Sequence, residues 1–319
     1  MSHRFVFIMD PIQRIDIQGD SSFALMLEAQ SRGCEVWYGL MKDLELLGDV
    51  PYADLTQIRV QQIEGDHFTV ISKEKICLNE VTAIFMRKDP PIDAEYFAST
   101  FILDFVSRDK VVMVNDPRSL RDCNEKIFAM RWPEMMPPTM VARSIDKIKA
   151  FIQKHQDVVV KPLNTSGGAG VVRLSHGDKN TGSILEMLTQ LEMNAIVAQA
   201  FLSKVTEGDR RVLLIGGEPI GVINRRPSDD DLRSNMHVGG VAEAAGLNSR
   251  DLEICQALRS ELVRLNLPFV GIDIIDGYLT EINVTSPTGF QELKRLSNID
   301  GAALLLDWIE AHQPSSASE

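Results

Sequence analysis

Three side chains near the C-terminal end of the chain, Asp273, Glu281 and Asn283, carry oxygen atoms suited to a metal ion. The surrounding residues 270–288 contain no cysteine or histidine. Carboxylate and amide oxygens are the ligands of hard cations such as Mg²⁺, which usually keep several waters and bridge to phosphate oxygens. These residue types therefore suit a site where a divalent ion meets a phosphate group.

The same segment predicts a β-hairpin, because apolar and polar residues alternate in two short runs on either side of Asp276-Gly277. Glu281 and Asn283 lie two residues apart and face the same side of a strand. A strict two-residue turn would place Asp273 on the opposite face. We therefore expect a longer, bulged loop. The alternative is an amphipathic hairpin whose polar face is only hydrated.

A glycine-rich segment, residues 161–170, lies between two predicted strands. It is not a Walker loop, which runs from a strand into a helix and ends in Gly-Lys-Ser/Thr. A glycine-rich loop between antiparallel strands can offer backbone N–H groups, here around Gly167 and Gly168, to phosphates. Lys161, at the end of the first strand, adds a positive charge. An ordinary flexible loop is the alternative, and the glycine density with the adjacent lysine favours phosphate contact.

A group of cationic side chains lies between the glycine-rich segment and the hairpin. Single surface arginines are usually only solvated, but their position in the sequence predicts a site for a multiply negative transition state. A polar stretch over 227–240, ending in two glycines, suits a mobile lid. The members of the group are Arg210, Arg211, Arg225, Arg226 and, in the polar stretch, Arg233 with Asn235.

The first part of the chain predicts a parallel sheet. Strand patterns over 5–9 and 34–40 flank a helix over 22–32, which makes a βαβ unit, and further strands are expected at 81–86 and 111–115. Ligands of such sheets bind beyond the carboxyl ends of the strands. No GxGxxG motif is present, so a Rossmann dinucleotide site has little support.

Loops at that edge carry polar side chains. The first strand leads to Asp10, Asp20, Ser21 and Ser22, and the strand at 81–86 leads to Arg87. Arg87 can hold a carboxylate through two hydrogen bonds, although a solvated surface charge fits the pattern equally well.

The rest of the chain predicts further helices and strands around the glycine-rich segment and the hairpin. Helices are expected over 94–109, 117–131, 145–155, 183–193, 249–265 and 299–311, with strands over 157–161, 171–174 and 195–202 and a hairpin over 211–224 that turns at Gly216-Gly217.

Composition limits the class of protein. The chain has 319 residues, 44% of them hydrophobic and 24% charged, as expected for a globular protein of two or three domains. Its net charge of −12 and pI of about 5.0 argue against nucleic-acid and membrane partners. Four widely spaced cysteines, together with the absence of a signal-peptide pattern, predict reduced thiols in the cytoplasm.

Several motifs together resemble one family. Lys126, then Lys161 with its glycines, then residues 199–202 and finally the hairpin follow the order typical of ATP-grasp ligases. More specifically, the chain from residue 5 to about 310 resembles the bacterial glutathione synthetases. The motifs that carry this resemblance are MDPI (9–12), DSSFALMLEAQSRG (20–33), MRKDPP (86–91), SLRDCNEK (119–126) and TEINVTSPTG (280–289).

The resemblance implies an α/β (α+β) chain with the ATP-grasp fold. It implies an N-terminal α/β domain for the substrate over 1–122, a central ATP subdomain over 123–202 and a C-terminal antiparallel domain over 203–319, with a lid over about 226–241. ATP would phosphorylate the cysteinyl carboxylate of γ-glutamylcysteine, and glycine would attack the acyl phosphate. The family also implies Mg²⁺ or Mn²⁺ and a homo-oligomer, either a tetramer or a dimer.

The resemblance also assigns roles to residues. Phosphates would be contacted by Lys126, Lys161, Gly167 and Gly168, the adenine by the backbone around Gln199, Phe201 and Leu202, and the ribose by Asp209. The metal ion would be held by Asp273, Glu281 and Asn283, and the transition state by Arg211, Arg225 and Arg233. The peptide and glycine would be contacted by Ser21, Ser22, Arg87, Asn235, Ser286 and Thr288.

Two other functions fit the motifs less well. A sister ligase could join a different amine to a peptide carboxylate, but MRKDPP and SPTG argue against it. A non-catalytic nucleotide-binding scaffold would not need all three metal ligands. The acidic residues 229–231 in the lid depart from the glycine-rich lid expected of the family, so the lid contacts are the weakest part of the resemblance.

Overall fold

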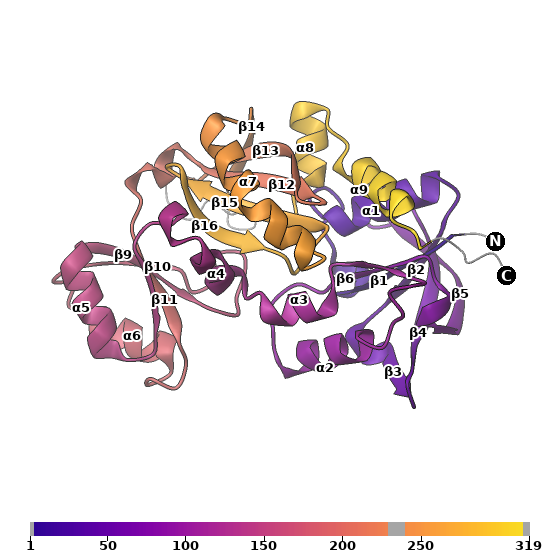
Figure 1. Cartoon of the computed structure of the whole chain (residues 1–319), viewed down its shortest axis with the longest axis horizontal. Coiled ribbons are helices and arrows are strands. Elements are labelled where there is room, and N and C mark those ends of the chain that lie inside the picture. Colours follow the sequence, from indigo (N-terminus) through magenta and orange to yellow (C-terminus); the bar gives the residue numbers. More distant parts are fainter. Residues whose placement is uncertain (1–2, 229–239, 315–319) are drawn as a thin grey trace.

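Three sheets follow one another along the chain in the computed structural model, which describes residues 3–228 and 240–314. Figure 1 shows the N-terminal sheet at one end of the molecule, the central sheet at the other end, and the C-terminal sheet between them. The mixed α/β architecture expected from the sequence is confirmed.

The N-terminal sheet has a parallel half, in which β1 lies between β2 and β6, and β7 forms the edge. Side chains of β1 alternate: Phe5 and Phe7 pack towards α1 and α9, whereas Val6 and Ile8 pack on the side of α2 and α3. The elements are β1 (Arg4–Met9), α1 (Ser21–Ser31), β2 (Glu35–Gly39), β6 (Ala83–Arg87), α2 (Ala94–Leu103), β7 (Val112–Val114) and α3 (Pro117–Asp122).

An antiparallel extension of this sheet was not predicted from the sequence. It is formed by β3 (Leu44–Leu47), β4 (Val50–Val60) and β5 (Phe68–Cys77), and β4 pairs with β2, β3 and β5. Six of the ten residues of β5 are exposed, Val70 and Ile71 among them, so its apolar residues do not alternate as in a half-buried strand. It is held by antiparallel pairing with β4, its neighbour in the chain.

The predicted helix over 117–131 is interrupted, so that prediction was wrong in its middle. Helix α3 ends at Asp122, and a new short helix, α4 (Glu125–Phe128), begins after Asn124. The Asn124 side chain caps α4 by accepting hydrogen bonds from the backbone N–H groups of Lys126 and Ile127, at 3.3 and 3.2 Å. The helix predicted over 94–109 likewise ends early, at Leu103.

The central sheet is antiparallel, in the order β10-β9-β11-β8, and two helices cover one face. The glycine-rich segment connects β9 to β10, and the antiparallel pairing of these strands confirms the sequence prediction. The elements are β8 (Thr139–Ala142), α5 (Ile145–His155), β9 (Asp157–Pro162), β10 (Val172–Ser175), α6 (Thr181–Thr189) and β11 (Ile196–Ala200).

The C-terminal sheet is antiparallel, in the order β14-β13-β12-β15-β16, with α7 on one side and α8 and α9 on the other. The hairpin at Gly216-Gly217 forms as predicted, whereas α8 was not predicted. The elements are β12 (Asp209–Ile215), β13 (Glu218–Arg226), β14 (Val241–Ala245), α7 (Ser249–Arg264), β15 (Phe269–Ile275), β16 (Tyr278–Asn283), α8 (Phe290–Ser297) and α9 (Gly301–Ala311).

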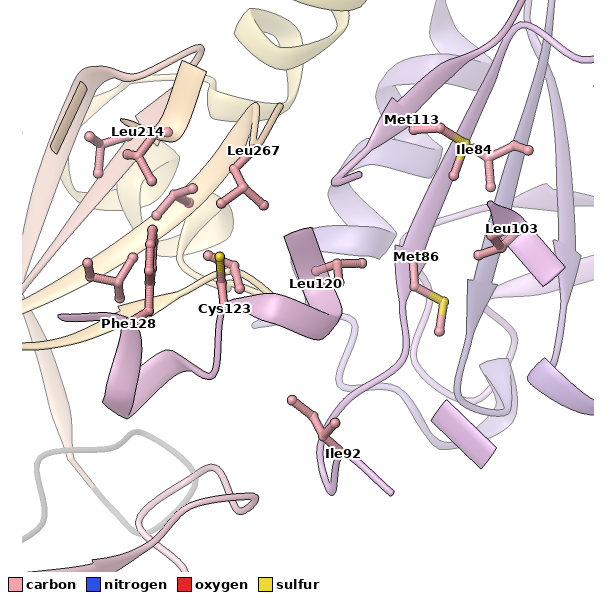
Figure 2. Packing of buried hydrophobic residues seen from close by; sticks show 14 of the residues in the cluster. Ile84, Met86, Ile92, Leu103, Met113, Leu120, Cys123, Phe128, Leu214 and Leu267 are labelled. Carbon is pink, nitrogen blue, oxygen red and sulfur yellow. The ribbon is translucent and has the colours of Figure 1, made fainter. Parts of the chain in front are cut away.

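One hydrophobic cluster joins the N-terminal and C-terminal sheets. Figure 2 shows Leu120 on the side of Met86, while Cys123 and Phe128 lie beneath Leu214. Side chains from α3 and α4 therefore fill the space between the two sheets.

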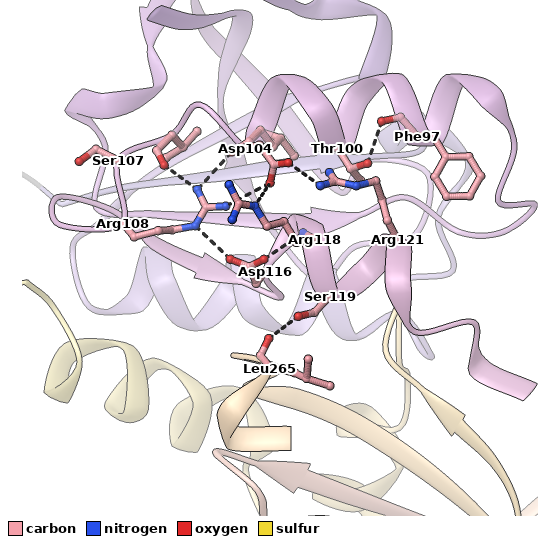
Figure 3. Close-up of polar contacts among 12 residues, drawn as sticks. Phe97, Thr100, Asp104, Ser107, Arg108, Asp116, Arg118, Ser119, Arg121 and Leu265 are labelled. Carbon is pink, nitrogen blue, oxygen red and sulfur yellow. Dashed lines mark hydrogen bonds and ion pairs between the residues drawn. The ribbon is translucent and has the colours of Figure 1, made fainter. Parts of the chain in front are cut away.

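Polar contacts reinforce this junction. Figure 3 shows Ser119 donating a hydrogen bond to the carbonyl of Leu265, next to a group of ion pairs around Asp104 and Asp116.

In the part of the chain that the structure describes, no helix combines the length and apolarity needed to cross a membrane.

Candidate active site

A cavity of about 1030 Å³ lies where the three sheets approach one another. Its wall includes residues from the first loop of the N-terminal domain, the glycine-rich segment, the end of β11 and the inner strands of the C-terminal sheet. Most of the residues singled out from the sequence meet here, although they come from segments more than 250 positions apart.

The hairpin of β15 and β16 turns more tightly than expected. Ile275 pairs with Tyr278, so the connection is a two-residue turn at Asp276 and Gly277. Both turn residues have positive φ, 51° and 74°, as a type I′ turn requires. The predicted longer loop was therefore wrong.

The predicted bulge is present, but it lies within the strand. Thr280 has no partner in the register, so Asp273 pairs with Glu281 and Gly271 pairs with Asn283. The extra residue moves Asp273 onto the face that carries Glu281 and Asn283. The three oxygen-bearing side chains consequently share one face of the hairpin, as the sequence analysis required.

Two arginines bind Asp273. Arg211 Nη2 lies 3.0 Å from Oδ2, Arg225 Nη2 lies 2.9 Å from Oδ1, and Asn283 donates to Oδ2 at 3.2 Å. Burial alone would raise the pKa of Asp273, but the two guanidinium groups hold this pKa well below its usual range. Asp273 is therefore a buried anion that fixes both arginines in the cavity.

Lys126 reaches the cavity because α4 begins at Glu125, after the break that follows α3. Its Nζ lies 2.9 Å from Glu281 Oε1 and donates to the carbonyl of Thr165, in the glycine-rich segment, at 2.7 Å. Burial opposes the charge of Lys126, but Glu281 and Glu125 outweigh it and raise the pKa of the lysine. Lys126 thus connects the hairpin of β15 and β16 to the glycine-rich segment.

Lys161 lies in the same cavity, and its Nζ donates to Gln199 Oε1 at 3.0 Å. The Gln199 amide in turn donates to the Thr139 hydroxyl at 3.0 Å. Burial lowers the pKa of Lys161, and the positive charge of Lys126 lowers it further, against the opposite effect of Glu281. A polyanionic ligand would offset this repulsion between two lysines.

The other residues predicted to bind the nucleotide also line the cavity. Gly167 and Gly168 have positive φ, 64° and 77°, a conformation that glycine adopts without strain. Because glycine has no Cβ atom, the loop backbone is open to a ligand at this turn. Leu202 lies on the wall, and the Phe201 ring stacks under the Arg173 guanidinium at 4.0 Å.

Asp209, the residue expected to contact the ribose, accepts a hydrogen bond from Arg225 Nη2 at 2.6 Å. Arg225 therefore bridges Asp209 and Asp273. A ribose bound by Asp209, as predicted, would share the Asp209 carboxylate with Arg225. Arg233 and Asn235, predicted for the lid, lie outside the described residues.

Ser21, Ser22 and Arg87 do not line the cavity, contrary to the expectation of direct peptide contact. Their exposed fractions are 0, 1 and 3%, and their polar groups are used internally. Ser21 accepts from the backbone N–H of Gly289 at 3.1 Å, while Arg87 donates to Ser22 at 2.9 Å and to the carbonyl of Pro287 at 2.8 Å. They hold the segment that follows the hairpin from behind.

That segment itself reaches the cavity, because Ser286 and Thr288 are both on its wall. The Thr288 carbonyl accepts a hydrogen bond from Arg211 Nη1 at 3.3 Å. Ser286 and Thr288 are thus placed where they could contact a substrate, whereas Ser21, Ser22 and Arg87 support this segment from within the protein.

Glu125 and Glu292 are carboxylates in the cavity that were not predicted. Glu125 Oε1 accepts the backbone N–H groups of Val284 and Thr285, each at 3.0 Å, and so fixes the chain after β16. Its position beside Lys126 was the only available sequence signal. Glu292 belongs to α8, the helix that the sequence analysis missed.

The donor set fits a divalent ion in chemical type. Glu281 and Asn283 line the cavity with hard oxygen ligands, beside two lysines that could hold phosphates. Asp273 is bound by two arginines, and no cluster of three or more histidine, cysteine or acidic side chains arranged to hold a metal is found in residues 3–228 and 240–314. Two carboxylates plus one amide remain as the candidate ligands.

The chain matches family models over nearly its full length. Residues 3–121 match the model described as the N-terminal domain of prokaryotic glutathione synthetase, and residues 125–298 match the one described as its ATP-grasp domain. A protein named glutathione synthetase from Rhodopseudomonas palustris is 46% identical, covering 95% of this chain and 96% of its own length. One of the same name from Vibrio cholerae is 43% identical, with 97 and 98% covered.

Solved structures share the fold at low sequence identity. D-cycloserine synthetase superposes with a TM-score of 0.68 at 14% identity, covering 97% of this chain and 99% of its own. The ATP-grasp ligase PsnB, complexed with a minimal precursor, gives 0.65 at 16% identity, with 98 and 100% covered. The arrangement of the three sheets is therefore that of ATP-grasp ligases.

Proposed function

The chain belongs to the prokaryotic glutathione synthetase family, and from this premise we propose how its cavity works. It is an ATP-dependent ligase that acts as a glutathione synthetase. In the reaction, the cysteinyl carboxylate of γ-glutamylcysteine is activated by ATP and joined to the amine of glycine. The products are glutathione, ADP and phosphate, which makes the enzyme a peptide-bond-forming carboxylate–amine ligase.

The observation that carries the site proposal is the convergence of four cations on one cavity. Lys126, Lys161, Arg211 and Arg225 come from three different parts of the fold, and all line the wall next to the hairpin. Phosphoryl transfer needs positioning and positive charge more than a covalent nucleophile. Four fixed cations beside hard oxygen ligands supply this requirement.

The chemistry then takes place in two steps. A carboxylate oxygen of the cysteinyl residue attacks the γ-phosphorus and ADP leaves, which gives an acyl phosphate. The free amine of glycine attacks the acyl carbon, phosphate leaves from the tetrahedral intermediate, and the nitrogen loses its proton. Arg211 and Arg225 stabilise the negative oxygen of this intermediate, and Asp273 keeps both in place.

The nucleotide occupies the part of the cavity between the central and C-terminal sheets. Lys126, Lys161 and the glycine-rich segment at Gly167 and Gly168 hold its phosphates. The backbone around Gln199, Phe201 and Leu202 takes the adenine, and Asp209 takes the ribose. Arg233 and Asn235 act from the lid, which excludes water and spares the acyl phosphate from hydrolysis.

Glu281, Asn283 and Asp273 would hold a divalent ion, Mg²⁺ or Mn²⁺, which when bound would supply positive charge to the phosphate oxygens. Ser286 and Thr288 contact the peptide, and Ser21, Ser22 and Arg87 support them from behind.

The organisation of the molecule is part of the proposal. The substrate domain comprises residues 1–122, the central ATP subdomain 123–202, and the C-terminal domain 203–319 with the lid over about 226–241. We propose a cytoplasmic homo-oligomer, a tetramer or a dimer, without nucleic-acid or membrane partners. Its net charge of −12 supports the last point.

The decisive experiment measures phosphate release from ATP with γ-glutamylcysteine, with and without glycine, and identifies the product by mass spectrometry. Release that depends on glycine and yields glutathione supports the proposal. Release that depends on the peptide but not on glycine keeps the acyl phosphate and reopens the identity of the acceptor. No release in any combination, with ATP still bound, would favour a nucleotide-binding scaffold.

A further inference from the structure

Glu292 is a buried carboxylate that the proposed chemistry leaves without a role. It lies in the first turn of α8 with 3% of its surface exposed, and it forms part of the cavity wall. Among the described residues, its Oε2 has no hydrogen-bond partner. A buried carboxylate with an unpaired oxygen costs free energy, and a cation bound to the same carboxylate would offset part of this cost.

The space in front of Glu292 is bordered by the first loop of the chain. A Cβ atom on Gly19 would lie 2.8 Å from Asp16 Oδ2 and 3.6 Å from Glu292 Oε1, so both carboxylates flank the same small space. The glycine at this position leaves that space open. Asp16 Oδ1 is used by the backbone N–H of Gln18 at 2.9 Å.

The charges around this corner of the cavity, the space bordered by Asp16 and Glu292, favour a bound cation. Burial raises the pKa of Glu292 and Asp16 raises it further, while its own backbone N–H, Arg295 and Arg211 only partly offset these effects. Asp20 is also on this wall, and with Asp16 and Glu292 it outnumbers Arg14, so the corner is acidic, unlike the lysine-lined part of the cavity. A positive group with N–H donors would neutralise the corner by binding Glu292 Oε1 and Asp16 Oδ2, the two oxygens that border this space.

We propose that Glu292, assisted by Asp16, binds the ammonium group of an amino-acid substrate. This inference rests on the proposed function, because both γ-glutamylcysteine and glycine carry such a group. Glu292 then selects for the amine-bearing substrate at the acidic end, while the lysines at the other end hold the phosphates. The cavity is thereby matched in charge to its substrates along its length.

The test is steady-state kinetics of Glu292→Gln, which keeps the size of the side chain and removes its charge. We expect the KM for one amino-acid substrate to rise about tenfold or more, because the variant loses a hydrogen bond between two charged groups. The KM for ATP should stay within about twofold. Asp16→Asn should raise the same KM to a smaller extent.

A peptide analogue without the glutamyl ammonium, glutaryl-cysteine, identifies which substrate is bound. If Glu292 binds the peptide ammonium, the wild-type protein handles glutaryl-cysteine poorly and Glu292→Gln adds little further loss, because the two changes remove one interaction. If it binds glycine, only the KM for glycine rises, and both peptides respond alike. Either result supports the inference.

Glu95→Gln is the matched control, because Glu95 also lies in the first turn of a helix, α2, but is exposed and away from the cavity. Calorimetric titration of the protein with γ-glutamylcysteine or glycine follows binding without turnover. The inference is overturned if Glu292→Gln changes neither affinity more than Glu95→Gln does, or if ATP affinity falls equally. A wild-type protein that forms no glutathione would instead contradict the proposed function, and titration would still test Glu292.

Discussion

Single side chains in the candidate site are held by ion pairs that a ligand can exchange. Glu281 is paired with Lys126, and Asp273 is shared by Arg211 and Arg225. Each pair keeps a charge from being buried alone, which would cost several kcal/mol per ion.

Glu281→Gln tests the proposed metal ligand. We expect kcat to fall about 100-fold or more, because the metal loses a carboxylate and Lys126 loses its partner. Rates measured over a range of Mg²⁺ concentrations, with circular dichroism to follow the fold, check this. Glu253→Gln, which removes an exposed partner of Arg250, is the control. Near-normal activity would remove Glu281 from the metal site.

Arg225→Ala tests the proposed stabilisation of the tetrahedral intermediate. We expect kcat to fall far more than ATP affinity. The free energy of unfolding should also fall, by about 3 kcal/mol, because Asp209 and Asp273 lose a buried partner. Arg225→Lys keeps the charge but loses the planar fork, so it separates catalysis from stability. A change confined to ATP affinity would count against this role.

At the scale of elements, two local irregularities bring the site together. The break between α3 and α4 turns Glu125 and Lys126 into the cavity, and the bulge at Thr280 moves Asp273 to the correct face. An uninterrupted helix or a regular hairpin would have placed these side chains elsewhere. Departures from regular structure are therefore what builds this site.

Asn124→Ala tests the helix break. Loss of the cap should lower the free energy of unfolding by about 1 kcal/mol and raise the KM for ATP severalfold, because Lys126 is no longer fixed. Chemical denaturation and initial rates measure the two effects. Asp93→Ala removes the cap of α2, which accepts from the N–H of Tyr96 at 2.9 Å, away from the cavity. An equal rise in KM in both variants would show that the effect is general destabilisation.

At the scale of the whole molecule, one amide connects two sheets. Asn115, after β7, donates to the carbonyls of Phe269 and Val284, each at 2.7 Å, and accepts from the N–H of Phe269 at 2.9 Å. These bonds join the N-terminal domain to the start of β15 and to the residue after Asn283. The position of the hairpin of β15 and β16 thus depends on the interface between the N-terminal and C-terminal domains.

Asn115→Ala should lower the free energy of unfolding by about 3 kcal/mol, at about 1 kcal/mol for each of three buried hydrogen bonds. It should also lower kcat, because the end of β16 loses its anchor. Urea denaturation and kinetics measure both. Asn79→Ala removes one amide contact inside the N-terminal domain, to the N–H of Ser107 at 2.7 Å. If Asn115→Ala lowered stability no more than Asn79→Ala does, the interdomain role would be wrong.

The sequence alone determined the features that local forces control. The helix over 145–155 and the hairpin turn at Gly216-Gly217 were predicted closely, because helical periodicity and the tolerance of glycine for positive φ are properties of neighbouring residues. The types of the chemical groups, with three oxygen ligands, two lysines and several arginines, were also readable. So was the resemblance to the family, which the comparisons confirm.

Only the tertiary structure decided how these groups combine. The pairing of Asp273 with two arginines, the burial of Arg87 behind the cavity wall and the unpartnered oxygen of Glu292 all depend on contacts between distant segments. Long-range contacts leave no periodic signal in a single sequence. The physical reason is that burial, which sets the charge and the accessibility of each group, is a property of the packed molecule and not of its neighbours in the chain.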